Sequence, residues 1–250
     1  MKNHQTLQAD RFTAGIILLL MFFVILMTSS CGEEETPEPV KPETSTMTDI
    51  DGNTYVTVKI GDQWWMAENL KVTQFRNGDP IANVSDAVQW ASTQAAAYCL
   101  FEGNVASPGL LYNAAAVSSQ QNLAPQGWRI PTDDDWKKLE RHLGLSSVDA
   151  TSWRGTDQGD QLKELGTVSW TRFADVWGNN ESGFTAKAGG CRMPDGVWGT
   201  PGLFATAFWW TATEKESGKY WYRHLDYKRS DIFRQYGNGQ YGFSVRCVKE

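Results

Sequence analysis

The residues between positions 219 and 240 carry the side chains best suited to chemistry in this chain. The segment is rich in Tyr, Arg, Asn, Gln and Asp, which combine wide, flat contact area with adaptable hydrogen bonding, as binding surfaces do. Apolar segments at residues 208–214 and 241–247 frame it. We therefore predict a display surface. Its aromatic rings would stack on a sugar ring or clamp a protein loop, and its amides and carboxylates would fix the orientation of the ligand.

Alternation along a predicted strand at 220–227 indicates which of these side chains face outward. The inward residues are expected to be Trp221, Arg223, Leu225 and Tyr227. The predicted ligand contacts are Tyr222, His224, Asp226, Lys228, Asp231, Phe233, Gln235, Tyr236 and Asn238. The alternative is an ordinary polar sheet surface.

Catalytic signatures are weak, and the sequence does not predict an enzyme. After residue 30 the histidines are His142 and His224, and the chain lacks Gly-x-Ser-x-Gly, His-Glu-x-x-His and phosphate-binding glycine motifs. No cofactor and no metal are expected. Paired carboxylates for glycoside hydrolysis stay open as an alternative, because their spacing is set in space and not in sequence. A passive surface-coat protein is a further alternative.

Two acidic stretches are better explained by local structure than by metal binding. Asp49, Asp51 and Asn53 resemble the start of a calcium loop, but the glycine comes too early and no closing Glu follows, so we predict a turn. The consecutive acids at residues 133–135 cannot converge on one point from a helix. They follow Thr132, a natural N-cap, and Asp135 stands where a capping box needs its acid.

The elements that must position the display surface can be outlined from residue patterns. Residues 55–60 alternate and are β-branched, which predicts a strand that turns at 61–62 and pairs with residues 63–67. A helix is predicted from residue 133 to Gly144 and a shorter one over 158–165, with Leu162 and Leu165 inward. Further strands are expected at 184–192, around Trp198, and at 208–213, 220–227 and 242–248, with a tight turn at 195–196. This order predicts an α+β domain of mostly antiparallel, irregular β-structure.

Three arginines lie beside apolar residues of the predicted strands. Arg223, Arg234 and Arg246 each need a carboxylate or carbonyl partner if they are half-buried. We expect them to have a structural role rather than to contact a ligand.

The N-terminal thirty residues form an export signal. Lys2 and Arg11 precede an apolar run at residues 14–27, which is shorter than the ~20 residues that a spanning helix needs. Small residues at 28–30 then lead to Cys31. This arrangement resembles a bacterial lipoprotein signal, so we predict that Cys31 carries a lipid such as palmitate. Thr28 departs from the usual Leu of such signals. An uncleaved anchor and an ordinary secretory signal are the alternatives.

Residues 31–48 are acidic and proline-rich and predict a solvated tether. The acids after Cys31 resemble a surface-export signal, with a plain spacer as the alternative. We therefore expect an outer-membrane, lipid-anchored protein exposed at the cell surface, with one domain over 49–250. The full chain has a net charge of −6, and loss of Lys2, Arg11 and Asp10 makes it −7. Nucleic acid is therefore not an expected partner.

Three cysteines follow Cys31, so one pair at most can form and one thiol stays free. They are Cys99, Cys191 and Cys247. An exported domain allows disulfides, and we favour Cys191 with Cys247, because both lie in predicted strands. The alternative is that all three are small buried apolar residues.

Six separated motifs together resemble a known family. They lie at residues 60–70, 127–136, 180–184, 189–192, 209–214 and 242–247. In this order they resemble the Fibrobacter succinogenes major paralogous domain, which is common in lipoproteins of Bacteroidota and covers nearly all of residues 49–250 here. The family usually has Cys-Pro before Gly127, where this chain has Ala124-Pro125, and the usual partner of that missing cysteine would be Cys99.

A more distant resemblance links the helix after Pro131 and the closing strand to C-type-lectin-like folds, including the sulfatase-modifying formylglycine-generating group. It implies a domain with two main helices, whose terminal strands meet in one sheet and whose irregular second half forms the binding face. The calcium motifs of lectins and the paired C-terminal cysteines of the sulfatase-modifying enzymes are absent from this sequence. The combined prediction is a binding module for a glycan or a cell-surface protein, with the membrane contacted through the lipid.

Overall fold

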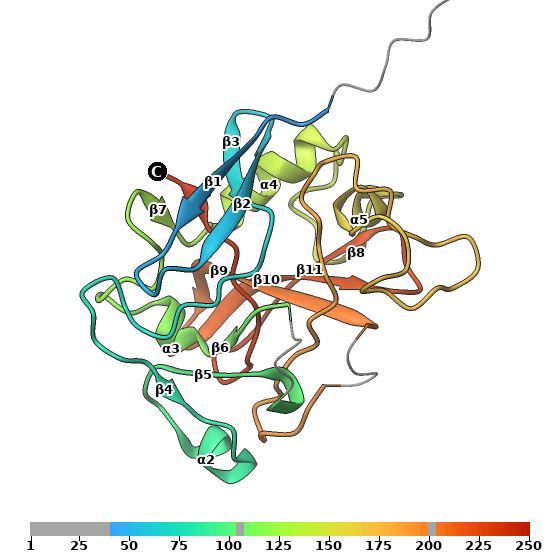
Figure 1. Cartoon of the computed structure of the whole chain (residues 1–250). Coiled ribbons are helices and arrows are strands. Elements are labelled where there is room, and N and C mark those ends of the chain that lie inside the picture. The colour runs from blue at the N-terminus through green and yellow to red at the C-terminus, as the bar shows by residue number, and fades with distance from the viewer. Residues whose placement is uncertain (1–40, 104–107, 200–203) are drawn as a thin grey trace, which may run out of the picture. The chain divides into compact units, whose positions relative to one another are not determined.

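Mixed helices and mostly antiparallel strands build the domain (Figure 1). The structure, a computed structural model, describes residues 41–103, 108–199 and 204–250. The described helices are α2 (Ala87–Ser92), α3 (Ala114–Val117), α4 (Asp133–His142) and α5 (Gln158–Leu162), with a 3₁₀ turn η1 (Phe101–Gly103). The α+β class predicted from the sequence is therefore confirmed, with four helices in the described residues.

The strands form three sheets. The first, of five strands, has the order β1 (Thr44–Thr48), β2 (Thr54–Ile60), β3 (Gln63–Met66), β12 (Val248–Lys249) and β7 (Trp128–Arg129). The second has the order β8 (Ser152–Arg154), β11 (Ile232–Asn238), β10 (Lys219–Asp226) and β9 (Thr206–Glu216). The third contains β4 (Ala82–Asn83), β5 (Ala97–Cys99) and β6 (Leu111–Tyr112), in which β4 and β5 pair in parallel.

The five-stranded sheet brings the two ends of the domain together (Figure 1). Strand β12 pairs with β3 and β7, and β1 pairs with β2 along its whole length. The part of the predicted tether at 44–48 is therefore a strand, because its Thr and Met side chains tolerate an extended edge position. Cys31 and the signal segment lie outside the described residues. Asp49 forms the predicted turn, accepting hydrogen bonds from the Asn53 backbone and side-chain amides.

Helix α4 begins as the sequence predicts. The Thr132 side chain accepts from the Asp135 backbone N–H, and the Asp135 carboxylate accepts from that of Thr132, so the capping box is confirmed. Trp136 lies on the buried face of α4, with its ring centroid 5.1 Å from that of Trp65 and 6.1 Å from that of Trp209. These large rings fix the helix against both larger sheets.

Three local predictions were wrong, each because the backbone leaves its regular conformation. Helix α5 ends at Leu162, and Lys163 adopts an extended ψ of 147°, so Leu165 is exposed instead of inward. Residues 184–192 form isolated bridges and no strand, since Thr185 and Gly190 have φ values of 55° and 63°. The predicted closing strand at 242–248 is also reduced to bridges followed by the short β12.

Strand β10 divides its side chains between two environments. Trp221, Arg223 and Leu225 are buried on one face, while Tyr222 and His224 are partly exposed on the other. The predicted alternation is confirmed for these five residues. Tyr227 was also expected to be inward; it packs against the same core cluster as Leu225 and is partly exposed, since β10 ends at Asp226.

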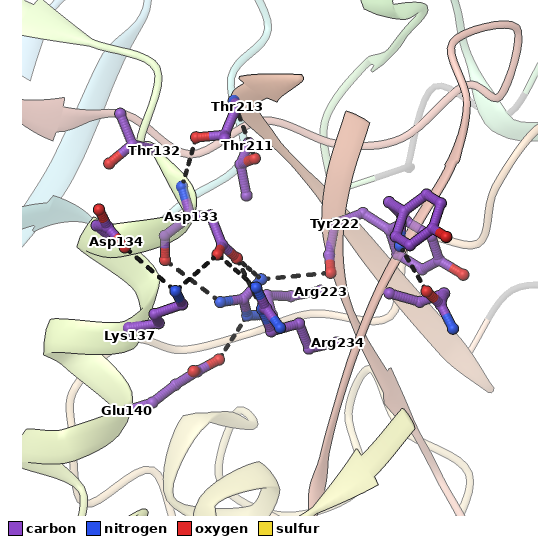
Figure 2. Close-up of polar contacts among 12 residues, drawn as sticks. Thr132, Asp133, Asp134, Lys137, Glu140, Thr211, Thr213, Tyr222, Arg223 and Arg234 are labelled. Atoms are coloured by element: carbon purple, nitrogen blue, oxygen red, sulfur yellow. Dashed lines mark hydrogen bonds and ion pairs between the residues drawn. The ribbon is translucent and has the colours of Figure 1, made fainter. Parts of the chain in front are cut away.

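A buried ion network holds α4 against the inner face of this sheet (Figure 2). We use this name for Asp133, Glu140, Arg154, Arg223 and Arg234. Asp133 Oδ1 lies 2.8 Å from Arg223 Nη1, and its Oδ2 lies 2.7 Å from Arg234 Nη2. Glu140 Oε2 accepts from Arg154 Nη2 at 2.6 Å, and its Oε1 accepts from Arg223. One helix is thus ion-paired to β8, β10 and β11.

Asp133 of the buried ion network stays ionised because its arginine partners outweigh burial. Burial alone would raise the pKa of Asp133, but hydrogen bonds and charges from Arg234 and Arg223 hold that pKa well below its usual range. Arg246, elsewhere in the core, donates to Asn69 Oδ1 and to the carbonyls of Phe184 and Thr185. The structural role predicted for Arg223, Arg234 and Arg246 is therefore confirmed.

Removing one charge from the buried ion network should destabilise the domain strongly. Glu140→Gln removes the buried carboxylate that pairs with Arg154 and Arg223, while Arg223 keeps its pair with Asp133, and this loss costs about 3–5 kcal/mol. Urea unfolding measures this loss. The matched control is Glu216→Gln, which disrupts an exposed pair with Lys219 and should change the unfolding free energy little. Equal effects of the two substitutions would contradict the structural role of the network.

Candidate functional site

The outer face of the four-stranded sheet carries a row of parallel rings. His224 of β10 stacks on Phe208 of β9, with centroids 4.1 Å apart and planes 9° apart. Phe208 stacks in turn on Phe243 at 4.9 Å, and Phe243 on Tyr241 at 5.1 Å. We call these four residues the aromatic row. The pairing of the strands places these rings side by side. His224 of β10 lies opposite Phe208 of β9, and residue 244 bridges to Trp209 along the edge of β9 that faces away from β10.

Tyr222 extends the aromatic row sideways. It follows the same alternation as His224, and its ring lies 5.0 Å from that of Phe243 and 6.2 Å from that of Phe233. The edge of Tyr222 meets Trp210 in a T-shaped contact. Each such ring pair adds about 0.5–1.5 kcal/mol beyond area burial, so the outer face is a rigid aromatic surface.

A second segment, residues 191–199, lies beside the aromatic row. We call residues 191–199 the hairpin wall. Arg192 and Gly242 exchange backbone hydrogen bonds, and Arg192 also bridges to Trp198. The predicted turn at 195–196 is confirmed: Gly196 has a φ of +80° and donates to the Met193 carbonyl.

The aromatic groove lies between the hairpin wall and the sheet and has a volume of about 460 Å³. This volume is within the range of small-molecule and side-chain pockets. Its described lining residues are Cys191, Met193, Asp195, Val197, Trp198, Gly199, Phe208, Tyr222, Tyr241 and Phe243.

The described lining of the aromatic groove carries one charged side chain, the carboxylate of Asp195. Burial, with smaller effects of Tyr241 and Cys191, raises the pKa of Tyr222 to about 12. Burial also raises the pKa of the Cys191 thiol to about 12. Among the described residues that line the groove, Asp195 is the one carboxylate, and it lies exposed at the rim.

Four of the predicted contacts lie on the outer face of the sheet. Tyr222 and His224 belong to β10, and Phe233 and Gln235 lie opposite them in β11. Within this group, Tyr222 lines the aromatic groove. His224 and Phe233 lie beside it, with centroids 5.7 Å apart.

Two predicted contacts lie on the opposite face. Tyr236 is directly opposite Trp221, and the two rings meet at 5.2 Å. Asn238 lies opposite Lys219, on the same side as Trp221, and its side chain accepts from the Gln240 backbone. Neighbouring strand residues point to opposite faces, so Gln235 and Tyr236 cannot serve one surface together.

The remaining predicted contacts cluster between β10 and β11. The Asp226 side chain accepts from the Lys228 backbone, and Asp231 forms a two-bonded ion pair with Arg229. Lys228 lies over the rings of Phe173 and Tyr227. None of these three predicted contacts is among the described residues that line the aromatic groove.

The groove residues missed by sequence analysis come from two places. Tyr241 and Phe243 were assigned to an apolar frame, although their spacing of two residues already placed both on one face. The hairpin wall contributes Met193 and Trp198, and no local pattern linked this segment to β10, because their proximity depends on the Arg192 and Gly242 pairing.

The cysteines of the described domain are buried free thiols. Cys99, Cys191 and Cys247 form no disulfide in the structure, so neither the favoured pair of Cys191 with Cys247 nor any other pair is found. Burial raises the pKa of Cys99 to about 12, with Arg192 opposing it. All three therefore behave as small apolar residues.

Neither a metal site nor a helix that could span a membrane occurs in the described ranges. Across residues 41–103, 108–199 and 204–250, no group of three or more His, Cys, Asp or Glu side chains is placed to hold a metal ion. In the same part of the chain, no helix is long and apolar enough to cross a membrane.

The chain forms a mixed α and β domain with an aromatic groove beside its four-stranded sheet. The model of the Fibrobacter succinogenes major domain family matches residues 58–249, and the chain belongs to that family. The match contains the aromatic row, the hairpin wall and the buried ion network. No curated protein and no solved structure matches the chain.

The aromatic environment of His224 predicts an unusual pH response. Burial, with a smaller effect of Lys163, lowers the pKa of His224 to about 3, and its Nε2 has no hydrogen-bond partner among the described residues. The unfolded chain takes up a proton near pH ~6.5, so the unfolding free energy should fall as the pH drops from neutral towards 3. His224→Phe should flatten this dependence, as measured by urea unfolding. An NMR titration of His224 with a midpoint near 6.5 would contradict the prediction.

Proposed function

We propose that this protein is a surface-exposed, lipid-anchored binding module that holds a glycan or a protein in the aromatic groove. The observation that carries the proposal is the aromatic row, which borders a groove of about 460 Å³ with a rigid sheet behind it. Phe208, Tyr222 and Tyr241 are partly exposed, and the buried Phe243 packs against all three. Such ordered aromatic side chains lose little entropy when a ligand binds. The proposed site is thus the part of the predicted surface around Tyr222 together with the hairpin wall.

The charge of the groove favours binding over glycoside hydrolysis. A glycosidase needs two carboxyl groups about 5–9.5 Å apart across its cleft. The described lining of the aromatic groove supplies Asp195 as its one carboxylate. The domain therefore has the pattern of a ligand pocket, with apolar walls and few polar groups.

The lipid anchor is part of the proposal and rests on the sequence. Residues 1–30 would direct export, and Cys31 would carry the lipid at the outer membrane, with the domain at the cell surface. Residues 32–43 would then be the tether, since β1 begins at Thr44. The acidic, proline-rich composition of this segment would favour a solvated tether.

A C-type-lectin-like fold with two main helices is proposed as the architecture of the module. Strands from both ends of the domain share the five-stranded sheet, and the second half of the domain contributes the groove. Helix α4 and helix α5 would be the two main helices, and α2 and α3 would be additions. This arrangement would place the groove away from the sheet where the tether enters.

Substitution of a groove tyrosine should abolish binding without unfolding the domain. We expect wild-type protein to bind at least one ligand on combined arrays of glycans and cell-surface proteins. Tyr241→Ala should lose that ligand, because Tyr241 is a partly exposed end of the aromatic row. The matched control, Tyr236→Ala, removes a tyrosine from the opposite face and should keep binding. Loss of binding in the control alone would contradict the proposed site, and thermal melting verifies that both variants fold.

Labelled palmitate tests the anchor. The wild-type chain should incorporate the label and fractionate with outer membranes, and Cys31→Ser should do neither, because the acyl chain needs the cysteine. Label retained by Cys31→Ser would contradict lipidation at this residue.

A further inference from the structure

The rings of the aromatic row cover one another. Phe208 lies between His224 and Phe243, and Phe243 lies between Phe208 and Tyr241. Both faces of these two phenylalanines are therefore occupied by neighbouring rings. A sugar ring stacks on an open aromatic face, and the middle of the row offers edges instead.

The ring of Trp198 in the hairpin wall is also covered by neighbouring groups. The Arg192 guanidinium lies 4.0 Å from the ring centroid of Trp198, and the Phe101 ring contacts the same tryptophan at 5.1 Å. Aromatic edges carry positive partial charge and attract the face of another ring. An aromatic or aliphatic side chain inserted between row and wall is the occupant that such edges accept best.

Hydrogen-bonding groups in the groove are sparse. The side chains of the described lining offer the hydroxyls of Tyr222 and Tyr241, the indole N–H of Trp198, the carboxylate of Asp195 and a buried thiol, and one Asp195 oxygen already accepts from the Val197 backbone. A glycan, with a hydroxyl on nearly every carbon, would lose more hydrogen bonds to water than these few groups replace. The deficit is small for an apolar side chain, whose burial gains about 1.5–3 kcal/mol.

The rim adds a preference of charge. Asp195 is exposed beside the groove, and the whole chain carries a net charge of −6. An acidic rim around an apolar pocket favours a ligand with a neighbouring positive charge and disfavours an acidic one.

From these observations we propose that the occupant of the aromatic groove is a polypeptide segment and not a glycan. It would bury one aromatic or aliphatic side chain between Trp198 and the aromatic row, with a basic residue beside it at Asp195. This inference deepens the proposed function and rests on it, because both assign the same groove.

Paired arrays separate this inference from the proposed function. A peptide array varies a central residue among Trp, Phe, Leu, Ala and Ser and flanks it with Arg or Glu, and a glycan array is probed in the same buffer. We expect the protein to bind peptides with a central Trp, Phe or Leu at least about tenfold better than those with Ser, a difference of ~1.4 kcal/mol. Arg-flanked peptides should exceed Glu-flanked ones by about fivefold, as for a rim charge pair.

Charge reversal at the rim supplies the matched variants. Asp195→Lys should invert the preference to Glu-flanked peptides, whereas Asp62→Lys, the same change in an exposed turn of the other sheet, should leave it unchanged. Glycan hits that Tyr241→Ala removes, without peptide hits, would overturn this inference and keep the groove as a site. No hits on either array would overturn the proposed function itself. A further outcome is that the protein self-associates in sedimentation and that Asp195→Lys abolishes this. In that case a second copy of the chain would occupy the groove, and the proposal of a different protein as the partner would be overturned.

Discussion

The ion pairs that Asp133 and Glu140 make with three buried arginines determine how this domain is built. Charges removed from water are costly unless every one is paired, so the arginines of β8, β10 and β11 can adopt this arrangement only when α4 lies against them. The capping box sets the start of the same helix and so fixes the position of Asp133 in its first turn. The capping box, a local interaction at the start of α4, therefore also constrains how the helix lies against the distant strands of the sheet.

This constraint determines which side chains of β10 lie on each face of the sheet. With Arg223 committed to the inner face, the alternation of the strand directs Tyr222 and His224 outward, where they meet Phe208 of β9. The outer face is then completed by residues 241–243 and by the hairpin wall, which Arg192 ties to Gly242. Arg223 of β10 and Arg234 of β11 are ion-paired on the other side of the sheet. This separation of charged and aromatic side chains supports our proposal of a binding surface.

Sequence reasoning succeeded where the determining interactions are local. The capping box, the turn at 195–196 and the alternation of β10 depend on neighbours within a few residues, and all three were predicted. It failed where distant segments decide. Tyr236 was grouped with Gln235 because no strand was predicted at 232–238, so alternation was not applied there, and the hairpin wall was missed because residue 192 meets residue 242 only in the fold. Leu165 was placed inward because nothing in the pattern showed that the helix ends at Leu162.

The most direct test of this account is the NMR spectrum of the domain with ¹³C-labelled methionine methyl groups, recorded with and without the best ligand from the arrays. After residue 31 the chain contains Met47, Met66 and Met193. Met193 lines the aromatic groove, Met47 lies in β1 and Met66 is buried in the core. The account predicts a ligand-dependent shift of the Met193 methyl signal while the other two stay in place. A shift of Met47 with Met193 unchanged would contradict the groove as the binding surface.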